Sequence, residues 1–136
     1  MRLMVAWSGT DQRRQTLVTQ SDNPTFAPRW SPDGRYILYS MAVGGNTDIY
    51  RMSANGGRSE RLTDAPGIDI GGSFSPDGSK IVFESDRSGS QQIYVMDADG
   101  SDERRITYVG NYNTTPEWSP DGSRLVFIVA AQQCQG

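Results

Sequence analysis

The sequence repeats itself every 44 residues, and this period constrains the fold more than any other feature. The tetrapeptide Ser-Pro-Asp-Gly occupies Ser31–Gly34, Ser75–Gly78 and Ser119–Gly122, so each copy starts 44 residues after the previous one. The register also holds far from this motif, because Ile49-Tyr50-x-Met52 returns as Ile93-Tyr94-x-Met96. Self-similarity at a period of about 40–50 residues is typical of β-propeller blades.

Each repeat predicts four β-strands joined by tight turns. In Ser-Pro-Asp-Gly, proline presets φ, aspartate accepts local backbone hydrogen bonds and glycine takes a positive φ, which suits a hairpin turn. The second strand is an apolar run, which predicts burial on both faces, and the fourth carries charges, as an outer edge strand does. The expected strands are Phe26–Trp30, Tyr36–Tyr39, Asp48–Met52 and Glu60–Thr63, then Ile70–Phe74, Lys80–Phe83, Gln92–Met96 and Glu103–Thr107, then Thr114–Trp118 and Arg124–Phe127.

A single four-stranded sheet cannot cover both of its apolar faces. Radial stacking of such sheets buries them, and propellers typically use about 4–8 blades of four antiparallel strands. A β-solenoid is the competing architecture, but its repeats are shorter and do not contain four strands. The sequence therefore predicts an all-β fold of propeller blades.

The phase of the repeat divides the chain into about three blades' worth of sequence. Residues 1–22 supply the last two strands of a blade, 23–66 and 67–110 are two full blades, and 111–136 supply the first two strands of another. Three blades are too few to close a ring. Either the chain is part of a longer propeller, or two copies self-associate into a six-bladed ring.

Composition excludes several classes of function. The chain has no histidine and one cysteine, Cys134, so a zinc cluster and a Ser-His-Asp triad are excluded. A net charge of −3 argues against nucleic acid, and no apolar stretch is long enough to span a membrane. Asp33, Asp77 and Asp121 recur once per repeat, which indicates turn formers and not catalysts. We predict no catalytic residue, no metal and no cofactor.

The stretch from Asn23 to Ile128 resembles the propellers of the TolB family, a PD40 or WD40-like family of the Tol–Pal system. The resemblance rests on Thr25–Gly34, on Ser75–Arg87 and on Gln91–Met96, and it covers about half of a TolB propeller. It implies a non-enzymatic protein-binding module, a periplasmic location and a Pal-like lipoprotein as the partner. Similar blades occur in prolyl-oligopeptidase-type peptidases, so the propeller portion of such a peptidase remains an alternative.

The segments that enter the innermost strands share the 44-residue frame but differ in residue type. Divergent tips on a repeated scaffold are where recognition usually resides. One hypothesis places Thr25, Asp69 and Asn113 in a polar ring around the channel mouth, with Tyr112 as an anchor for a partner. The other reading is that these segments are only polar connections.

Overall fold

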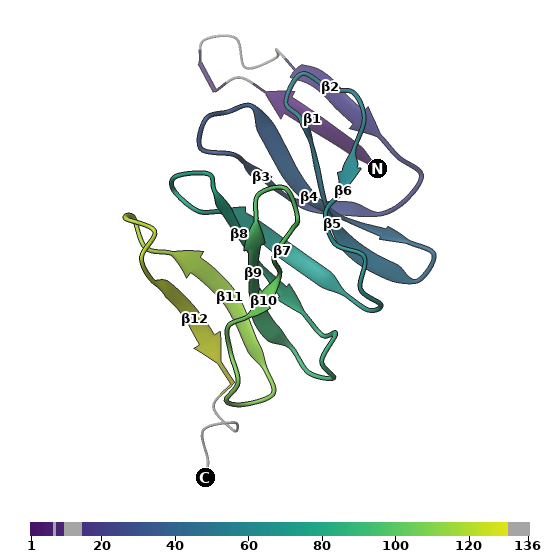
Figure 1. Ribbon diagram of the computed structural model, residues 1–136. Helices are drawn as coiled ribbons and strands as arrows, with labels where there is room; N and C mark the ends of the chain where they lie inside the picture. The colour runs from purple at the N-terminus through teal and green to yellow at the C-terminus, as the bar shows by residue number, and fades with distance from the viewer. Residues whose placement is uncertain (7, 10–14, 131–136) are drawn as a thin grey trace.

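The computed structural model describes residues 1–6, 8–9 and 15–130, and every regular element in these ranges is a β-strand (Figure 1). Parts of the predicted half-blades 1–22 and 111–136, and Cys134, lie outside the described residues. In the described ranges, no segment forms a helix long and apolar enough to cross a membrane. The prediction of an all-β propeller fold is confirmed.

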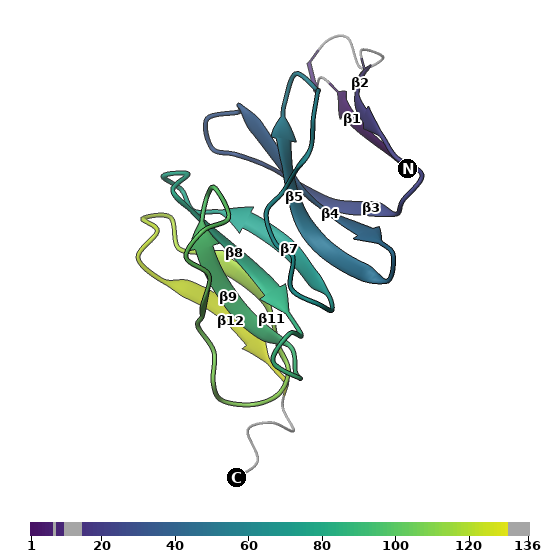
Figure 2. The same cartoon turned by 45° about the vertical axis from the view of Figure 1, so that its right-hand side comes forward.

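The strands form four antiparallel sheets that follow one another along the chain. Figure 1 shows the sheets in a row with the first two strands at one end and the last strand at the other, and Figure 2 keeps this order after a 45° turn. The sheets are β1 (Arg2–Ala6) with β2 (Gln15–Gln20); β3 (Thr25–Trp30), β4 (Tyr36–Val43), β5 (Asn46–Ser53) and β6 (Glu60–Arg61); β7 (Asp69–Phe74), β8 (Lys80–Ser85), β9 (Gln92–Asp97) and β10 (Arg104–Arg105); and β11 (Asn113–Trp118) with β12 (Leu125–Val129).

The second strands are longer than the apolar run predicts, and the fourth strands are shorter. The β4–β5 ladder continues to the pair Val43↔Asn46, because Gly44 and Gly45 take positive φ angles of 59° and 90° that close a tight turn. The outer strand β6 has only two residues. Just beyond it, the hydroxyl of Thr63 accepts the backbone N–H of Ile49 at 3.0 Å. A side chain thus replaces the next step of the ladder.

Each innermost strand contains a bulge at the same position of the repeat. The pairing register shifts between residues 26 and 29, between 70 and 73, and between 114 and 117. Within these bulges Ala27, Gly71 and Thr115 have φ angles of 55°, 70° and 55°. A left-handed residue of this kind is uncommon outside glycine, and a bulge bends and twists its strand.

The Ser-Pro-Asp-Gly turns are fixed by the hydrogen bonds that the sequence predicts. In the second blade, Asp77 Oδ1 accepts the Ser75 hydroxyl at 2.7 Å and the backbone N–H of Ser79 at 3.0 Å. The backbone N–H of Lys80 donates to the Ser75 hydroxyl at 3.0 Å. The hydrogen bonds that Asp77 accepts, with the backbone N–H of Ser79 as the largest contributor, lower the pKa of Asp77 to about 2.

The main core lies between the two complete blades. A buried cluster joins Leu38, Ile49 and Leu62 of the first blade to residues of the second blade, which are Phe74, Ile81, Phe83, Tyr94 and Met96. Isolated parallel bridges Thr47↔Ile68 and Gln91↔Tyr112 tie each third strand to the segment that enters the next innermost strand. Successive blades are therefore held both by apolar burial and by backbone pairing.

Candidate functional site

The predicted polar residues occupy the first position of the three innermost strands. Thr25 begins β3, Asp69 begins β7 and Asn113 begins β11. Thr25 is half-buried, whereas Asp69 and Asn113 have no exposed surface. The shared frame brings the three residues to equivalent positions, but the neighbouring blade covers two of them.

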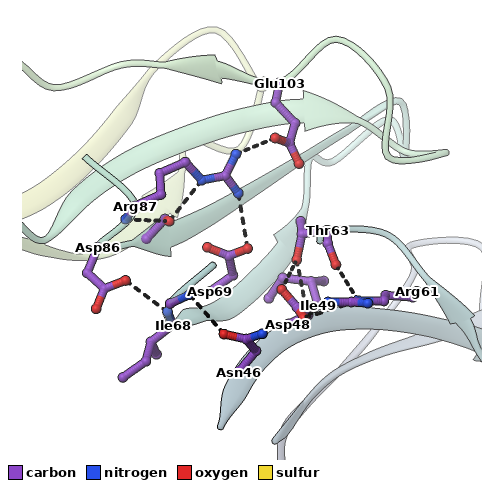
Figure 3. Close-up of polar contacts among 12 residues, drawn as sticks. Asn46, Asp48, Ile49, Arg61, Thr63, Ile68, Asp69, Asp86, Arg87 and Glu103 are labelled. Atoms are coloured by element: carbon purple, nitrogen blue, oxygen red, sulfur yellow. Dashed lines mark hydrogen bonds and ion pairs between the residues drawn. The ribbon is translucent and has the colours of Figure 1, made fainter. Parts of the chain in front are cut away.

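Asp69 contributes to a charged cluster that joins strands of the second blade (Figure 3). Arg87 Nη2 donates to Asp69 Oδ2 at 3.0 Å, and the same guanidinium pairs with Glu103 and donates from Nε to Ser85 Oγ at 3.0 Å. Burial raises the pKa of the Asp69 carboxyl, and the charge of Arg87 opposes this rise. Arg87 thus lets a fully buried aspartate be accommodated, which is a structural role.

A second polar cluster lies beside Asp69 and consists of Asp48, Arg61 and Thr63, from the outer half of the first blade. Arg61 Nη2 donates to Asp48 Oδ2 at 2.6 Å, and Arg61 Nε donates to the Thr63 carbonyl at 3.0 Å (Figure 3). Thr63 Oγ1 also lies 3.3 Å from Asp48 Oδ1. The side chain of Asp48 is almost fully buried, and Arg61 provides its countercharge.

The next blade interface repeats this geometry with neutral side chains. Gln92, in frame with Asp48, accepts at Oε1 from Thr107 Oγ1 at 2.6 Å and from Asn113 Nδ2 at 2.9 Å. The backbone N–H of Ile93 donates to Thr107 Oγ1 at 2.9 Å, as Ile49 does to Thr63. One interface therefore carries acids where the other carries amides. In each interface one buried oxygen, Asp69 Oδ1 or Asn113 Oδ1, has no hydrogen-bond partner.

The residues directly before Thr25, Asp69 and Asn113 are exposed to solvent. Pro24, Ile68 and Tyr112 each precede an innermost strand in the same frame, and all three are exposed, Ile68 by 46% and Tyr112 by 49%. We call these three residues the entry row. The sequence predicts Tyr112 as an anchor, and this stays a prediction. Ile68, which the sequence analysis does not name as a site residue, lies 44 residues before Tyr112, and this offset is the signal that identifies it.

Backbone hydrogen bonds fix the position of the entry row. The Tyr112 carbonyl accepts the N–H of Ala130 at 3.1 Å, and the Ile68 carbonyl accepts the N–H of Asp86 at 3.2 Å. The N–H of Ile68 donates to Asp86 Oδ1 at 2.8 Å (Figure 3). Exposed apolar side chains on a fixed backbone can bind a protein surface at low entropic cost.

Neither a metal centre nor a catalytic constellation emerges from these clusters. Within the described ranges, no group of three or more acidic, histidine or cysteine side chains could hold a metal ion. The carboxylates that the fold brings together are engaged with arginines or with turn backbone.

Comparisons with known proteins agree with the geometry. The family described as PD40, the TolB beta propeller domain, matches residues 3–135. The Tol-Pal system protein TolB of Francisella tularensis subsp. mediasiatica is 39% identical over 61 residues, which are 45% of this chain and 14% of that protein.

Solved structures show the same likeness. A putative TolB from Agrobacterium tumefaciens has a TM-score of 0.77 and 36% identity, with 86% of this chain and 43% of that chain covered. TolB from Acinetobacter baumannii has a TM-score of 0.66 and 24% identity, with 96% and 44% covered. The chain thus spans less than half the length of these relatives.

Enzymes with propellers are also similar, at lower identity. They include an oligogalacturonate lyase from Vibrio parahaemolyticus, a puromycin hydrolase and a prolyl endopeptidase, at 17%, 16% and 20% identity. Likeness at this level shows the fold alone.

Proposed function

Because the chain belongs to the TolB beta propeller domain family, we propose that it acts as a non-enzymatic protein-binding module of the TolB type. The observation that carries this proposal is the entry row, where exposed apolar residues recur at one position of successive blades. Its relatives are named as Tol-Pal system proteins. The partner that follows from this family is a Pal-like lipoprotein, and the compartment is the periplasm.

Within this surface, Tyr112 is the proposed anchor. Its ring combines a large apolar face with a hydroxyl group, and tyrosine is enriched among the residues that dominate binding energy. Ile68 extends the apolar strip to the neighbouring blade, and Thr25 offers a half-buried hydroxyl beside Pro24. Asp69 and Asn113 act on this surface by fixing the strand starts that carry it.

Titration calorimetry with the soluble domain of a Pal-like lipoprotein tests the proposal. We expect saturable binding by the intact chain, and a loss of about 30-fold in affinity for Tyr112→Ala, which corresponds to about 2 kcal/mol. Arg35→Ala is the control, because Arg35 is exposed in the turn between β3 and β4, away from the strand starts that carry the entry row. Absence of binding by folded protein, or an equal loss for Arg35→Ala, would contradict the proposal.

We also propose that two copies of the chain complete one six-bladed ring. The specific observation is that the described residues form two complete blades, one outer half-blade (β1–β2) and one inner half-blade (β11–β12). These halves are complementary, because β1 and β2 would serve as the third and fourth strands of a blade, whereas β11 and β12 are a first and a second strand. A closed ring has no exposed blade edge.

A further inference from the structure

Two carboxylates of the second blade lie near the entry row without a countercharge. Glu84 stands near the end of β8, and Asp86 follows that strand. Among the described residues, no arginine or lysine forms an ion pair with either side chain. Arg87, the next residue in the chain, is engaged by Asp69 and Glu103 instead. The two carboxylates therefore leave a negative potential at this end of the blade.

These two acids belong to one repeat and are not a requirement of the fold. The positions in frame with them carry no charge in the other repeats; they are Ser40 and Ile128 for Glu84, and Ala42 and Ala130 for Asp86. The turn aspartates, in contrast, recur in all three repeats because each hairpin uses them. A blade can thus form without Glu84 and Asp86, which makes a role in recognition the better explanation of their charge.

Asp86 is bonded directly to the entry row. Its Oδ1 accepts the backbone N–H of Ile68 at 2.8 Å (Figure 3), and its own backbone N–H donates to the Ile68 carbonyl at 3.2 Å. The other carboxylate oxygen, Oδ2, accepts no hydrogen bond from the described residues. Asp86 therefore holds a negative charge next to an exposed apolar residue of the entry row.

Glu84 lies at the junction of two innermost strands and is almost fully buried, with 8% of its surface exposed. Its Oε1 accepts hydrogen bonds from Gln91 Nε2 at 2.8 Å and from the Thr114 hydroxyl. Its Oε2 accepts none from the described residues and lies beside Gly71, where an added Cβ would be 3.1 Å away. Both donors are neutral, so the carboxylate is desolvated and oriented while its charge stays unbalanced.

The residues that hold the Glu84 carboxylate are also neighbours of Tyr112. Gln91 forms an isolated parallel bridge with Tyr112, and Thr114 stands two positions after Tyr112 in the chain. Tyr112 is 49% exposed, so its ring is open to a partner. The face of a tyrosine ring attracts a cation. A buried carboxylate and an exposed aromatic ring thus meet at one place on the entry row.

We propose that the partner of this chain presents a lysine or arginine side chain, whose charged end pairs with Glu84 while its aliphatic stem lies against Tyr112. This inference rests on the proposed protein-binding function and names the chemistry of the contact. Long basic side chains suit the place because their stems bury along apolar surface while their charged ends reach a carboxylate. The fixed orientation of Glu84 lowers the cost of pairing, and Asp86 steers the basic side chain towards it.

A tetralysine peptide with blocked ends tests the inference without the lipoprotein. We expect it to shift the backbone amide resonances of Ile68 and Tyr112, saturably, in NMR spectra of the intact chain. The same peptide with acetylated lysines keeps the aliphatic stems but has no charge, so we expect no shift from it. Equal shifts with the two peptides, or none with tetralysine, would overturn the inference.

The variant Glu84→Gln locates the site. Glutamine keeps a side-chain oxygen that can accept from Gln91 and Thr114, but it removes the charge. The affinity for tetralysine should fall about tenfold. Glu117→Gln is the matched control, because it makes the same change of charge at an exposed position near the other end of β11, and it should change the affinity less than about twofold. An equal loss in both variants would show a general attraction to acidic protein and would overturn the site.

The calorimetric titration with the lipoprotein domain reports on the proposed function separately. Binding of that domain with no response to tetralysine would overturn this inference alone. A response to tetralysine without binding of the lipoprotein domain would contradict the proposed function alone, so the two failures are distinguishable.

Discussion

The indole of Trp118 donates a hydrogen bond of 3.1 Å to the backbone carbonyl of Ser73, and it thereby joins the innermost strands of two successive blades. Trp118→Phe keeps an aromatic ring in the interface but removes this bond. We expect the free energy of unfolding to fall by about 1 kcal/mol, the usual net value of one hydrogen bond. Urea unfolding measures this change in the free energy of unfolding. Tyr108→Phe is the control, because Tyr108 is 70% exposed and this substitution should change stability by less than about 0.5 kcal/mol.

Substitutions at the left-handed bulge residue should change stability in opposite directions at Thr115 and at Gly71. Thr115 holds a φ of 55°, which is costly for a β-branched residue, so Thr115→Gly should raise stability by about 1 kcal/mol. Gly71 has a φ of 70°, and an added Cβ would lie 3.1 Å from Glu84 Oε2, so Gly71→Ala should lower stability by about 1 kcal/mol or more. Thermal unfolding of both variants checks the pair, and the same sign for both would contradict the left-handed bulge.

Substitutions at Thr25 and at Asn113, which occupy the same position of the repeat, should differ in their effect on stability. Asn113 donates to Gln92 Oε1 at 2.9 Å and to the Val109 carbonyl at 3.0 Å while fully buried. Asn113→Ala leaves these acceptors without that donor and should cost about 1–3 kcal/mol. Thr25→Ala at the half-buried equivalent position should cost less than about 0.5 kcal/mol. Chemical denaturation of the two variants, at equal protein concentration, provides the comparison.

Two turn aspartates should make the fold sensitive to acid. Hydrogen bonds lower the pKa of Asp77 and of Asp121 to about 2, below the unfolded value of about 3.9. Their contribution to stability is therefore present above pH 4 and is lost as the pH falls towards 2. Burial raises the pKa of Asp69, which acts in the opposite direction.

Comparing the wild type with a variant that lacks both carboxylates isolates the contribution of Asp77 and Asp121 to the pH dependence of stability. The double variant Asp77→Asn/Asp121→Asn keeps an acceptor in each turn but cannot titrate. Its stability should depend less on pH than that of the wild type between pH 4 and 2, as measured by urea unfolding at each pH. Parallel curves for the two proteins would show that these carboxylates do not act in this way.

The sequence predicts the blades because the 44-residue repeat carries both turn chemistry and apolar runs. It does not predict the bulge, since Ala27, Gly71 and Thr115 share a backbone conformation but no residue type. Nor does it predict that Asp69 and Asn113 are covered, because their burial depends on how the neighbouring blade packs and not on local pattern. Ile68 could have been found from its offset to Tyr112.

The mass of the intact chain in solution tests most directly whether it works as half of a closed ring. Static light scattering over a concentration series should give a plateau at twice the 15.0 kDa of one chain, because closure leaves no free edge for further growth. A mass that stays at 15.0 kDa at every concentration, or one that rises without a plateau, would contradict the closed two-copy ring.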